Sequence, residues 1–227
     1  MRLCLKSIKK ETFMLKKTLL ISTLLSTSLF AQFNYDISNI SADVKKRMID
    51  GDSWREGCPV SLKKLRYVRI NHWDFNGETT TGELIVHEDV AEELAYIFEE
   101  LYNIHYPINQ MKLVSDYEGN DWESIEAGNT SAFNCRPVTG KKKKWSKHAY
   151  GRAIDINPIE NPYVSRTGHI SHKASLKYKK RVHKVNSYAD HALLLKSDQA
   201  TKIFKNYGWK WGGDWRTIKD YQHFVKK

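Results

Sequence analysis

The sequence predicts an α+β fold. Some segments carry apolar residues at helical spacing, others read as strands, and several of the strands are short segments of the antiparallel type. The chain has 227 residues, of which 41% are hydrophobic and 12% aromatic. That composition is typical of a folded globular protein and too apolar for a disordered one, so we expect one domain with a proper core.

The first elements follow from local patterns. Residues 41–49 are predicted to form a short helix, because Ser41 can act as its N-cap. Residues 65–71 and 82–87 are rich in β-branched and aromatic side chains and are predicted to be strands.

A longer helix is predicted over residues 88–102, with Asp89 as its cap. Its apolar residues recur at helical spacing: Val90, Leu94, Ile97, Phe98 and Leu101. The remaining elements are predicted as strands over 111–115, 151–156 and 223–225 and as a helix over 197–207 that Gly208 closes. Residues 157–190 are polar and basic, and we expect a loop or a lid there.

Residues 1–31 are predicted to be a secretory signal. Lys16 and Lys17 precede an apolar run that ends at Ala31, and this run is too short for the roughly 20 residues of a membrane-spanning helix. Met14 would give a signal of ordinary length, and translation could start there. The alternative is an uncleaved or amphipathic anchor. We therefore expect an exported protein, periplasmic or secreted, without a membrane span once the signal is removed.

The net charge of the full chain is +11, and it is smaller once residues 1–31 are left out. Residues 1–31 hold six Lys or Arg and one acid, so the remaining 196 residues carry +6. Two basic stretches lie at 141–144 and 173–184. They are either solvated loops or surfaces that attract an anionic polymer such as a cell wall. The lysine run lacks interleaved aromatic residues, so nucleic acid is not an expected partner.

Two cysteines, Cys58 and Cys135, remain after the leader. In an exported protein this number favours one disulfide, and two unpaired buried thiols are the alternative. Neither cysteine has the spacing of a redox motif or of a cysteine–zinc site.

Candidate metal ligands occur in two places. His148 and Asp155 are separated by six residues, with small residues between them, and Asp220 lies three residues before His223. Imidazole nitrogens and carboxylate oxygens both bind zinc, and three protein ligands leave a fourth position open for water. A His and an Asp at this spacing are a weak signal by themselves. Asp220 could accept a proton from that water.

Three motifs in order carry a family resemblance. They are Ser146-x-His148-x-x-Gly151-x-Ala153-x-Asp155, then Gly208-Trp209-x-Trp211-Gly212-Gly213-Asp214-Trp215, then Asp220-x-x-His223-Phe224. Together they resemble the zinc D-alanyl-D-alanine carboxypeptidases and L-alanyl-D-glutamate endopeptidases, a family that includes VanY-type carboxypeptidases and phage endolysin peptidases. Residues 129–137 also resemble the stretch before the zinc motif in a branch of this family. The resemblance covers residues 58–224.

The resemblance implies a central antiparallel sheet flanked by helices, shared in outline with the hedgehog signalling domain. It implies that His148, Asp155 and His223 hold one Zn²⁺ per chain. Asp220 matches the catalytic carboxylate that activates water, and Arg136 matches an arginine that binds substrate or steadies the oxyanion.

Other positions of the motifs have weaker assignments. Ser146 matches a substrate-contacting position, and we expect Trp215 near the site as a second substrate-binding residue. Trp209 and Trp211 are expected in the core or in a pocket wall. Asp214 could form a turn or support a zinc ligand.

We therefore expect a zinc metallopeptidase that hydrolyses peptidoglycan stem peptides. The alternative is a non-catalytic wall-binding or signalling module on the same fold, which would often have lost Asp220. The expected organisation is a signal at 1–31, an N-terminal extension at 32–57 and a monomeric peptidase domain at 58–227. The sequence leaves open whether the terminal D-Ala or an internal bond is cut.

Overall fold

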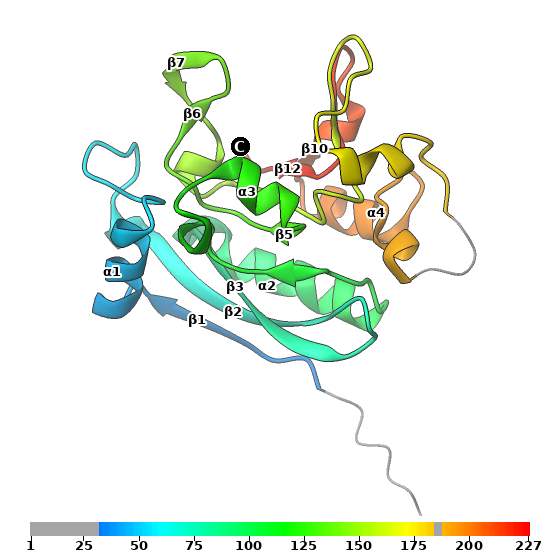
Figure 1. Cartoon of the computed structure of the whole chain (residues 1–227). Helices are drawn as coiled ribbons and strands as arrows, with labels where there is room; N and C mark the ends of the chain where they lie inside the picture. The colour runs from blue at the N-terminus through cyan, green and yellow to red at the C-terminus, as the bar shows by residue number, and fades with distance from the viewer. Residues whose placement is uncertain (1–31, 184–187) are drawn as a thin grey trace, which may run out of the picture. The chain divides into compact units, whose positions relative to one another are not determined.

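This computed structural model describes residues 32–183 and 188–227. Within them, the sheet with the longest strands has three strands in antiparallel order. The strands are β1 (Tyr35–Asn39), β2 (Leu65–Trp73) and β3 (Thr79–His87), and β2 lies in the middle. Helix α2 (Glu88–Asn103) follows β3 directly and packs on this sheet (Figure 1). The predicted strands at 65–71 and 82–87 are confirmed, and both extend further than expected.

Residues 32–57, which the sequence analysis separates as an extension, lie within one compact unit that spans Gln32–Lys227. They supply β1 to the sheet and helix α1 (Ala42–Asp50), whose Met48 is buried. Ser41 caps α1 as predicted, because its hydroxyl accepts a hydrogen bond from the Val44 N–H at 3.2 Å. A domain boundary at residue 58 stays a prediction. The predicted signal at 1–31 lies outside the described residues.

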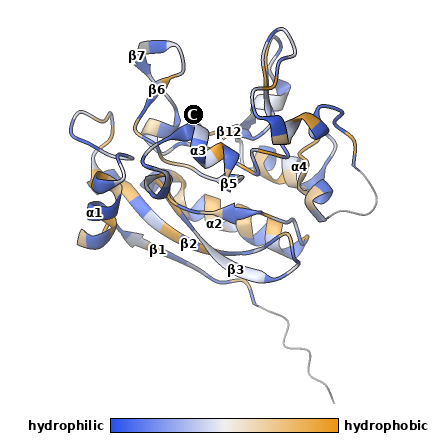
Figure 2. Cartoon of the chain, in the orientation of Figure 1, coloured by the Kyte–Doolittle hydropathy of each residue, from blue (hydrophilic) through white to orange (hydrophobic). Residues whose placement is uncertain are grey.

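The middle of the chain is built from short elements that connect the sheet to the C-terminal part. They are the 3₁₀ helix η2 (Val114–Tyr117), helix α3 (Asp121–Glu126), the parallel pair β4 (Gln110–Met111) and β5 (Asn129–Thr130), and the hairpin of β6 (Pro137–Val138) and β7 (Lys141–Trp145). The 3₁₀ helix η1 (Leu62–Lys64) comes earlier and leads directly into β2. Figure 2 shows hydrophilic colours along β7, in contrast to the mixed colours of α2.

A second three-stranded sheet has the order β10–β12–β8 and is antiparallel. The C-terminal elements are η3 (His148–Tyr150), β8 (Ala153–Asp155), β9 (Tyr163–Val164), η4 (Lys173–Tyr178), η5 (Tyr188–Ala192), α4 (Gln199–Asn206), β10 (Lys210–Trp211), η6 (Gly212–Asp214), β11 (Lys219–Asp220) and β12 (His223–Val225). Strands and helices are thus mixed, with mostly antiparallel pairing, and the predicted α+β class is confirmed.

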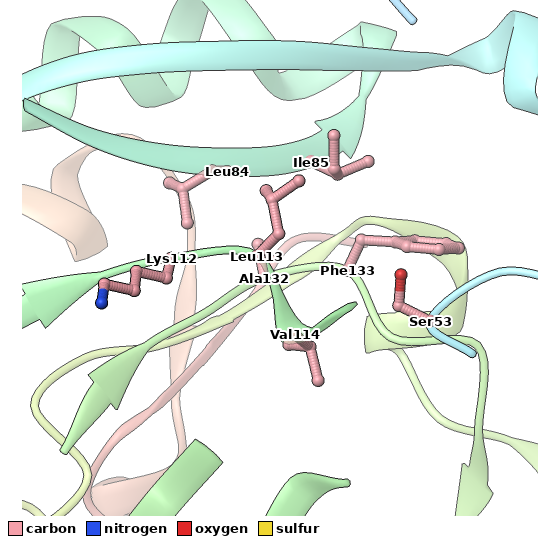
Figure 3. A pocket seen from close by; sticks show the side chains of 8 residues that line it. All are labelled: Ser53, Leu84, Ile85, Lys112, Leu113, Val114, Ala132 and Phe133. Atoms are coloured by element: carbon pink, nitrogen blue, oxygen red, sulfur yellow. The ribbon is translucent and has the colours of Figure 1, made fainter. Parts of the chain in front are cut away.

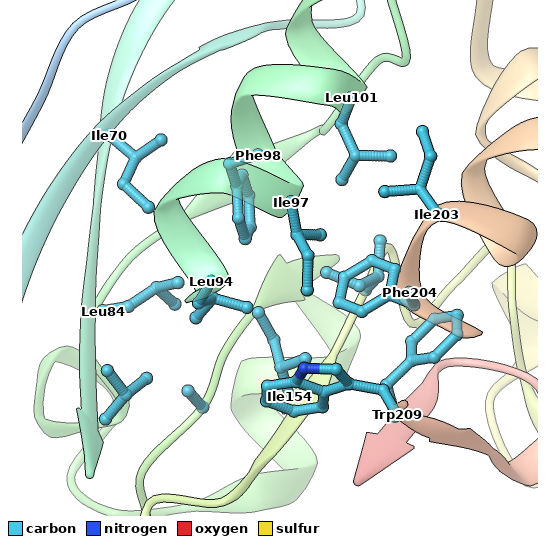
Figure 4. Close-up of a cluster of buried hydrophobic side chains, with 14 of the residues drawn as sticks. Ile70, Leu84, Leu94, Ile97, Phe98, Leu101, Ile154, Ile203, Phe204 and Trp209 are labelled. Carbon is cyan, nitrogen blue, oxygen red and sulfur yellow. The ribbon is translucent and has the colours of Figure 1, made fainter. Parts of the chain in front are cut away.

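The main core is formed by apolar side chains of both three-stranded sheets and of helices α2 and α4. Figure 4 shows Leu94, Ile97 and Phe98 of α2 facing side chains of β3, β8 and α4. Phe204 of α4 stacks on Phe224 of β12 with ring centroids 4.0 Å apart. The second sheet is therefore attached to the first through α2 and α4, and β8 and β12 have buried apolar neighbours.

Five local predictions need correction. The cap of α2 is His87, whose ring accepts a hydrogen bond from the Asp89 N–H, while Asp89 lies in the first turn. Residues 111–115 are not one strand, because the chain leaves β4 at Met111 and turns into η2. The predicted strand at 151–156 is limited to β8, and helix α4 begins only after Asp198.

The fifth correction concerns residues 157–190, which contain more structure than a loop. Strand β9 lies within them and pairs with β11, with Tyr163 opposite Asp220. The 3₁₀ helix η4 also forms there, and Tyr178 at its end is 4% exposed. Part of this stretch, 184–187, lies outside the described residues. The segment is thus connected directly to the strand that carries a predicted catalytic residue.

Candidate metal centre and active site

Three of the predicted ligands converge in the structure. His148, Asp155 and His223 each place a ligand atom within 4.8 Å of those of the other two, and all three residues are buried. His148 Nε2 lies 3.2 Å from His223 Nδ1 and 3.2 Å from Asp155 Oδ2. Asp155 Oδ1 lies 2.9 Å from His223 Nδ1.

These spacings fit a small tetrahedral metal ion. Zinc binds imidazole nitrogen and carboxylate oxygen at about 2.0–2.2 Å, so two ligand atoms of a tetrahedral site are roughly 3.3 Å apart. The two histidine nitrogens and the carboxylate oxygens lie at nearly that distance from one another. The donor set of two imidazoles and one carboxylate therefore suits zinc and would leave one position open.

Strand register brings two of these residues together. β12 and β8 pair so that His223 stands directly opposite Asp155, and Phe224 stands opposite Ile154 on the core side. Side chains alternate across a strand, so the residue pair next to the buried Phe224 and Ile154 points to the other face. The alternation of apolar and polar residues thus places the candidate metal ligands at one edge of the core.

His148 comes from the turn before β8. Gly151 ends this turn with φ +66°, and a Cβ there would lie 2.6 Å from the His87 backbone nitrogen. The His148 Nδ1 atom lies 2.5 Å from the Ala132 carbonyl oxygen, to which it can donate its proton. With its proton on Nδ1, the ring directs the lone pair of Nε2 toward Asp155 and His223. Metal-binding histidines are commonly oriented in this way.

The buried cluster perturbs its own ionisation. Burial alone would raise the pKa of Asp155, but the charge and hydrogen bonds of His148 and His223 hold this pKa well below its usual range. Burial likewise opposes a charge on His223, but its hydrogen bond to Asp155 and the charges of Asp155 and Asp220 raise the pKa of His223. The positive charge of Arg136 acts in the opposite direction. A carboxylate that stays ionised in this setting is a suitable cation ligand.

Asp220 lies close enough to interact electrostatically with this cluster. Burial, followed by the negative charge of Asp155, raises the pKa of Asp220 to about 6, although His223, Gln222 and His148 oppose the rise. Its Oδ1 atom is buried and has no hydrogen-bond partner among the described residues. A carboxylate with a pKa near neutrality and a free oxygen is suited to accept and return a proton.

Gly212 permits the backbone to approach Asp220. A Cβ at Gly212 would lie 2.4 Å from the Asp220 carbonyl oxygen and 2.9 Å from the Asp220 Cβ. On its other side, Asp220 is paired with Tyr163 through β9 and β11. Asp220 is therefore held between a glycine turn and the segment at 157–190 that was predicted to be a loop or lid.

The tryptophans of the second motif separate as expected. Trp209 and Trp211 are buried in the core, whereas the Trp215 ring lies 5.5 Å from the His223 ring. Asp214 instead pairs with Lys205 at 2.7 Å, a contact that does not involve the clustered ligands. The structure thus places Trp215 beside the site.

Ser146 and Arg136 lie next to the turn that carries His148. The Ser146 hydroxyl accepts a hydrogen bond from the His148 N–H at 3.3 Å, and the Ser146 N–H donates to the Arg136 carbonyl at 3.0 Å. Ser146 is 7% exposed, so in this structure its visible contact is with the turn. The Arg136 guanidinium is paired with Asp121, the first residue of α3.

The predicted disulfide between Cys58 and Cys135 is present. It joins two positions that are 77 residues apart, and Cys135 directly precedes Arg136. The bond therefore fixes the segment from which Arg136 extends.

Two partners of the site were not predicted. The Ala132 carbonyl is a backbone group, so no side-chain pattern reveals it. Asp121 lies fifteen residues from Arg136 in sequence, and only an acidic residue at the start of a short helix marks it. A small cavity lies near Ala132, between β3 and residues 112–114 (Figure 3). Its volume of about 10 Å³ is about what one water molecule needs, so it is no substrate site.

Comparison with known protein families supports the resemblance to zinc carboxypeptidases. Residues 139–226 match the family model described as D-alanyl-D-alanine carboxypeptidase, a metallopeptidase family. The resemblance seen in the motifs is confirmed over this stretch, which includes the three clustered residues and Asp220 but not Arg136. No curated protein and no solved structure matches the chain. Among the described residues, no helix has the length and apolar character needed to cross a membrane.

Proposed function

We propose that the protein is a zinc peptidase that hydrolyses the stem peptides of peptidoglycan. The observation that carries the proposal is the convergence of His148, Asp155 and His223 beside Asp220, whose buried Oδ1 atom has no partner among the described residues. The match of residues 139–226 to a carboxypeptidase family supports the same activity.

His148, Asp155 and His223 would hold one zinc ion per chain. The bound ion would supply Lewis-acid chemistry, which polarises a carbonyl and lowers the pKa of water. Asp220 accepts the proton of the attacking water through Oδ1 and then returns it to the leaving amine. Arg136 donates hydrogen bonds to the substrate or to the developing oxyanion. Ser146 and Trp215 border this reaction and contact the substrate.

The family chemistry and the disulfide favour action outside the cytoplasm. Disulfides persist in oxidising compartments, and Cys58–Cys135 is formed in the structure. We propose that residues 1–31 direct export and that a monomer acts in the periplasm or after secretion. A net charge of +6 after signal removal suits an anionic wall, which contains the carboxylates of the stem peptides.

A non-catalytic wall-binding module on the same fold is the second candidate. It would bind peptidoglycan without needing a proton acceptor beside the metal. Burying a carboxylate oxygen without a partner destabilises the fold, so a binding module would gain from replacing Asp220. Its presence favours the enzyme.

Digestion of purified muropeptides tests the proposal. The zinc-loaded protein is expected to release products whose masses identify the bond, either loss of a terminal D-Ala or cleavage within the stem. A chelator should abolish product formation, and added zinc should restore it. Binding to intact wall without any product in the presence of zinc would support the non-catalytic module and contradict the proposal.

A further inference from the structure

A half-buried ion pair lies beside the candidate active site, and its acidic member, Asp121, has no part in the mechanism above. Asp121 binds one edge of the Arg136 guanidinium. The Arg136 Nε atom donates to Asp121 Oδ1 at 3.0 Å, and Nη2 lies 2.9 Å from Oδ2. Arginine and carboxylate match each other in this two-point geometry, which fixes the plane of the guanidinium as well as its position.

The main chain on both sides of the pair is anchored. The Asn134 side chain donates to the Gly119 carbonyl at 3.0 Å, and Asn120 caps α3 by accepting from the Trp122 N–H at 3.0 Å. The Arg136 carbonyl accepts from the Ser146 N–H, two residues before His148. Asp121 and Arg136 therefore meet between two fixed segments, one of which continues to a metal ligand.

The contact leaves part of the guanidinium available. Nε and Nη2 face Asp121, and Nη1 has a 3.4 Å contact to the Pro137 carbonyl. Each terminal nitrogen of a guanidinium carries two N–H donors, so one donor on Nη1 and one on Nη2 are not used by these contacts. The unused Nη2 donor lies on the edge of the guanidinium opposite Nε, and that edge could face a carbonyl oxygen.

We propose that Asp121 is a positioning residue that holds the Nε edge of Arg136 so that its opposite edge faces the substrate carbonyl. This inference rests on the proposed function for its effect on turnover. Its structural part, that Asp121 fixes the Arg136 side chain, can be tested without any substrate.

The structure offers a matched control. Arg47 of α1 uses the same atoms toward Asp116, with Nε to Oδ1 at 2.8 Å and Nη2 to Oδ2 at 2.6 Å. That pair joins α1 to η2. Arg47 also donates to Glu83 at 3.1 and 2.6 Å, and its contacts do not include the metal-ligand cluster. Asp116→Asn should therefore report what the loss of a similar ion pair does to the fold alone.

The first measurement follows the Arg136 Nε–H resonance by NMR, assigned by its absence in Arg136→Lys. We expect a sharp signal in the wild type and in Asp116→Asn, and a signal broadened or lost in Asp121→Asn. An unchanged signal in Asp121→Asn would overturn the inference. Circular dichroism and melting establish that each variant is folded, and Asp121→Glu, which retains the charge, should recover part of the signal.

The second measurement is muropeptide hydrolysis by the zinc-loaded variants. Asp121→Asn should lower kcat by between about 10-fold and 100-fold with zinc content unchanged, because a misplacement of about 1 Å is enough for such a loss. Asp116→Asn should retain the wild-type kcat. In an Arg136→Ala background, adding Asp121→Asn should cause no further loss, because Asp121 acts through Arg136.

The outcomes separate the two proposals. Wild-type protein that forms no product contradicts the proposed function, and the NMR signal still decides whether Asp121 holds Arg136. Wild-type protein that is active while Asp121→Asn keeps full kcat contradicts the inference and leaves the function intact. Equal and additive losses in both backgrounds would assign Asp121 a role independent of Arg136 and overturn the inference as well.

Discussion

The N-terminal sheet and the C-terminal site region use different means to hold their shape. β2 and β3 each have nine residues and α2 has sixteen, and their apolar faces supply much of the main core. In the site region, β8 and β12 have three residues each, and β9, β10 and β11 have two. Long elements stabilise the first region by burial, whereas the second depends on particular contacts.

This difference separates stability from chemistry. The contacts that place the ligands include the register of β12 on β8, the Ala132 carbonyl, and the close approach of Gly212 to Asp220. Changes in the N-terminal sheet should therefore affect unfolding more than the geometry of the site. Changes in the site region should alter metal binding or turnover while most of the core is unaffected.

Exchanging a ligand should have the largest effect. His223→Ala removes one of the three proposed ligands, so we expect zinc loss and muropeptide hydrolysis at background level. Leu94→Ala in α2 is the matched scaffold change, and it should lower the free energy of unfolding by about 2–5 kcal/mol while the folded protein still binds zinc. Elemental analysis and denaturant unfolding measure both. If His223→Ala retained one zinc per chain, the claim that the site region alone determines metal binding would be contradicted.

The disulfide should give the next largest effect, because it ties the chain before β2 to the segment that carries Arg136. Replacing both Cys58 and Cys135 by Ala removes a cross-link over 77 residues, which the chain-entropy model values at about 4–5 kcal/mol. Urea unfolding of the double variant, with wild type in the presence and absence of a reductant, measures this loss. Identical midpoints in all samples would show that the bond does not stabilise the fold.

Gly212→Ala should separate turnover from zinc binding within the site region. The added Cβ would displace Asp220, so we expect turnover to fall by between about 10-fold and 100-fold at unchanged zinc content. Gly140→Ala is the control for a strained glycine replacement away from Asp220, because its φ of +75° disfavours any side chain but its Cβ would meet no atom within 4 Å. Equal turnover in the two variants would contradict the role of Gly212.

The smallest expected effect depends on pH. Burial is the main cause that raises the pKa of Glu160 from 4.5 to about 7, and its hydrogen bond from Tyr178 opposes the rise. The folded protein then binds a proton that the unfolded chain has already lost, so this group reduces stability as pH rises from 4.5 to 7. Below pH 4.5 the penalty is absent.

Glu160→Gln should therefore raise the free energy of unfolding by at most about 3 kcal/mol at pH 8 and change it little at pH 4.5. Denaturant unfolding at both pH values, with the exposed Glu123→Gln as control, measures the difference. A gain that is the same at both pH values would argue against ionisation of Glu160 as its cause.

The two regions also differ in what their sequence predicts. The apolar stripe from Val90 to Leu101 and the strands before it predicted α2, β2 and β3, because long elements repeat their pattern. Strands of two residues have no periodicity, so neither β9, inside the expected loop at 157–190, nor its pairing with β11 could be predicted. The convergence of His148, Asp155 and His223 was predictable only because ordered motifs supplied what the spacing alone did not.

Contacts between distant residues explain what the sequence could not predict at the site. Counting cysteines predicted Cys58–Cys135, since only two remained to pair. Nothing in the sequence identified Asp121 as the partner of Arg136, because acidic residues at helix starts are common and satisfy the helix dipole by themselves.

The central claim is that the buried cluster binds zinc while Asp220 moves the proton. The most direct test compares zinc content and muropeptide turnover in the wild type and in Asp220→Ala. We predict one zinc per chain in both proteins, and a turnover in Asp220→Ala reduced by about 10²–10⁴-fold. Turnover near the wild-type value in the zinc-loaded variant would contradict the account.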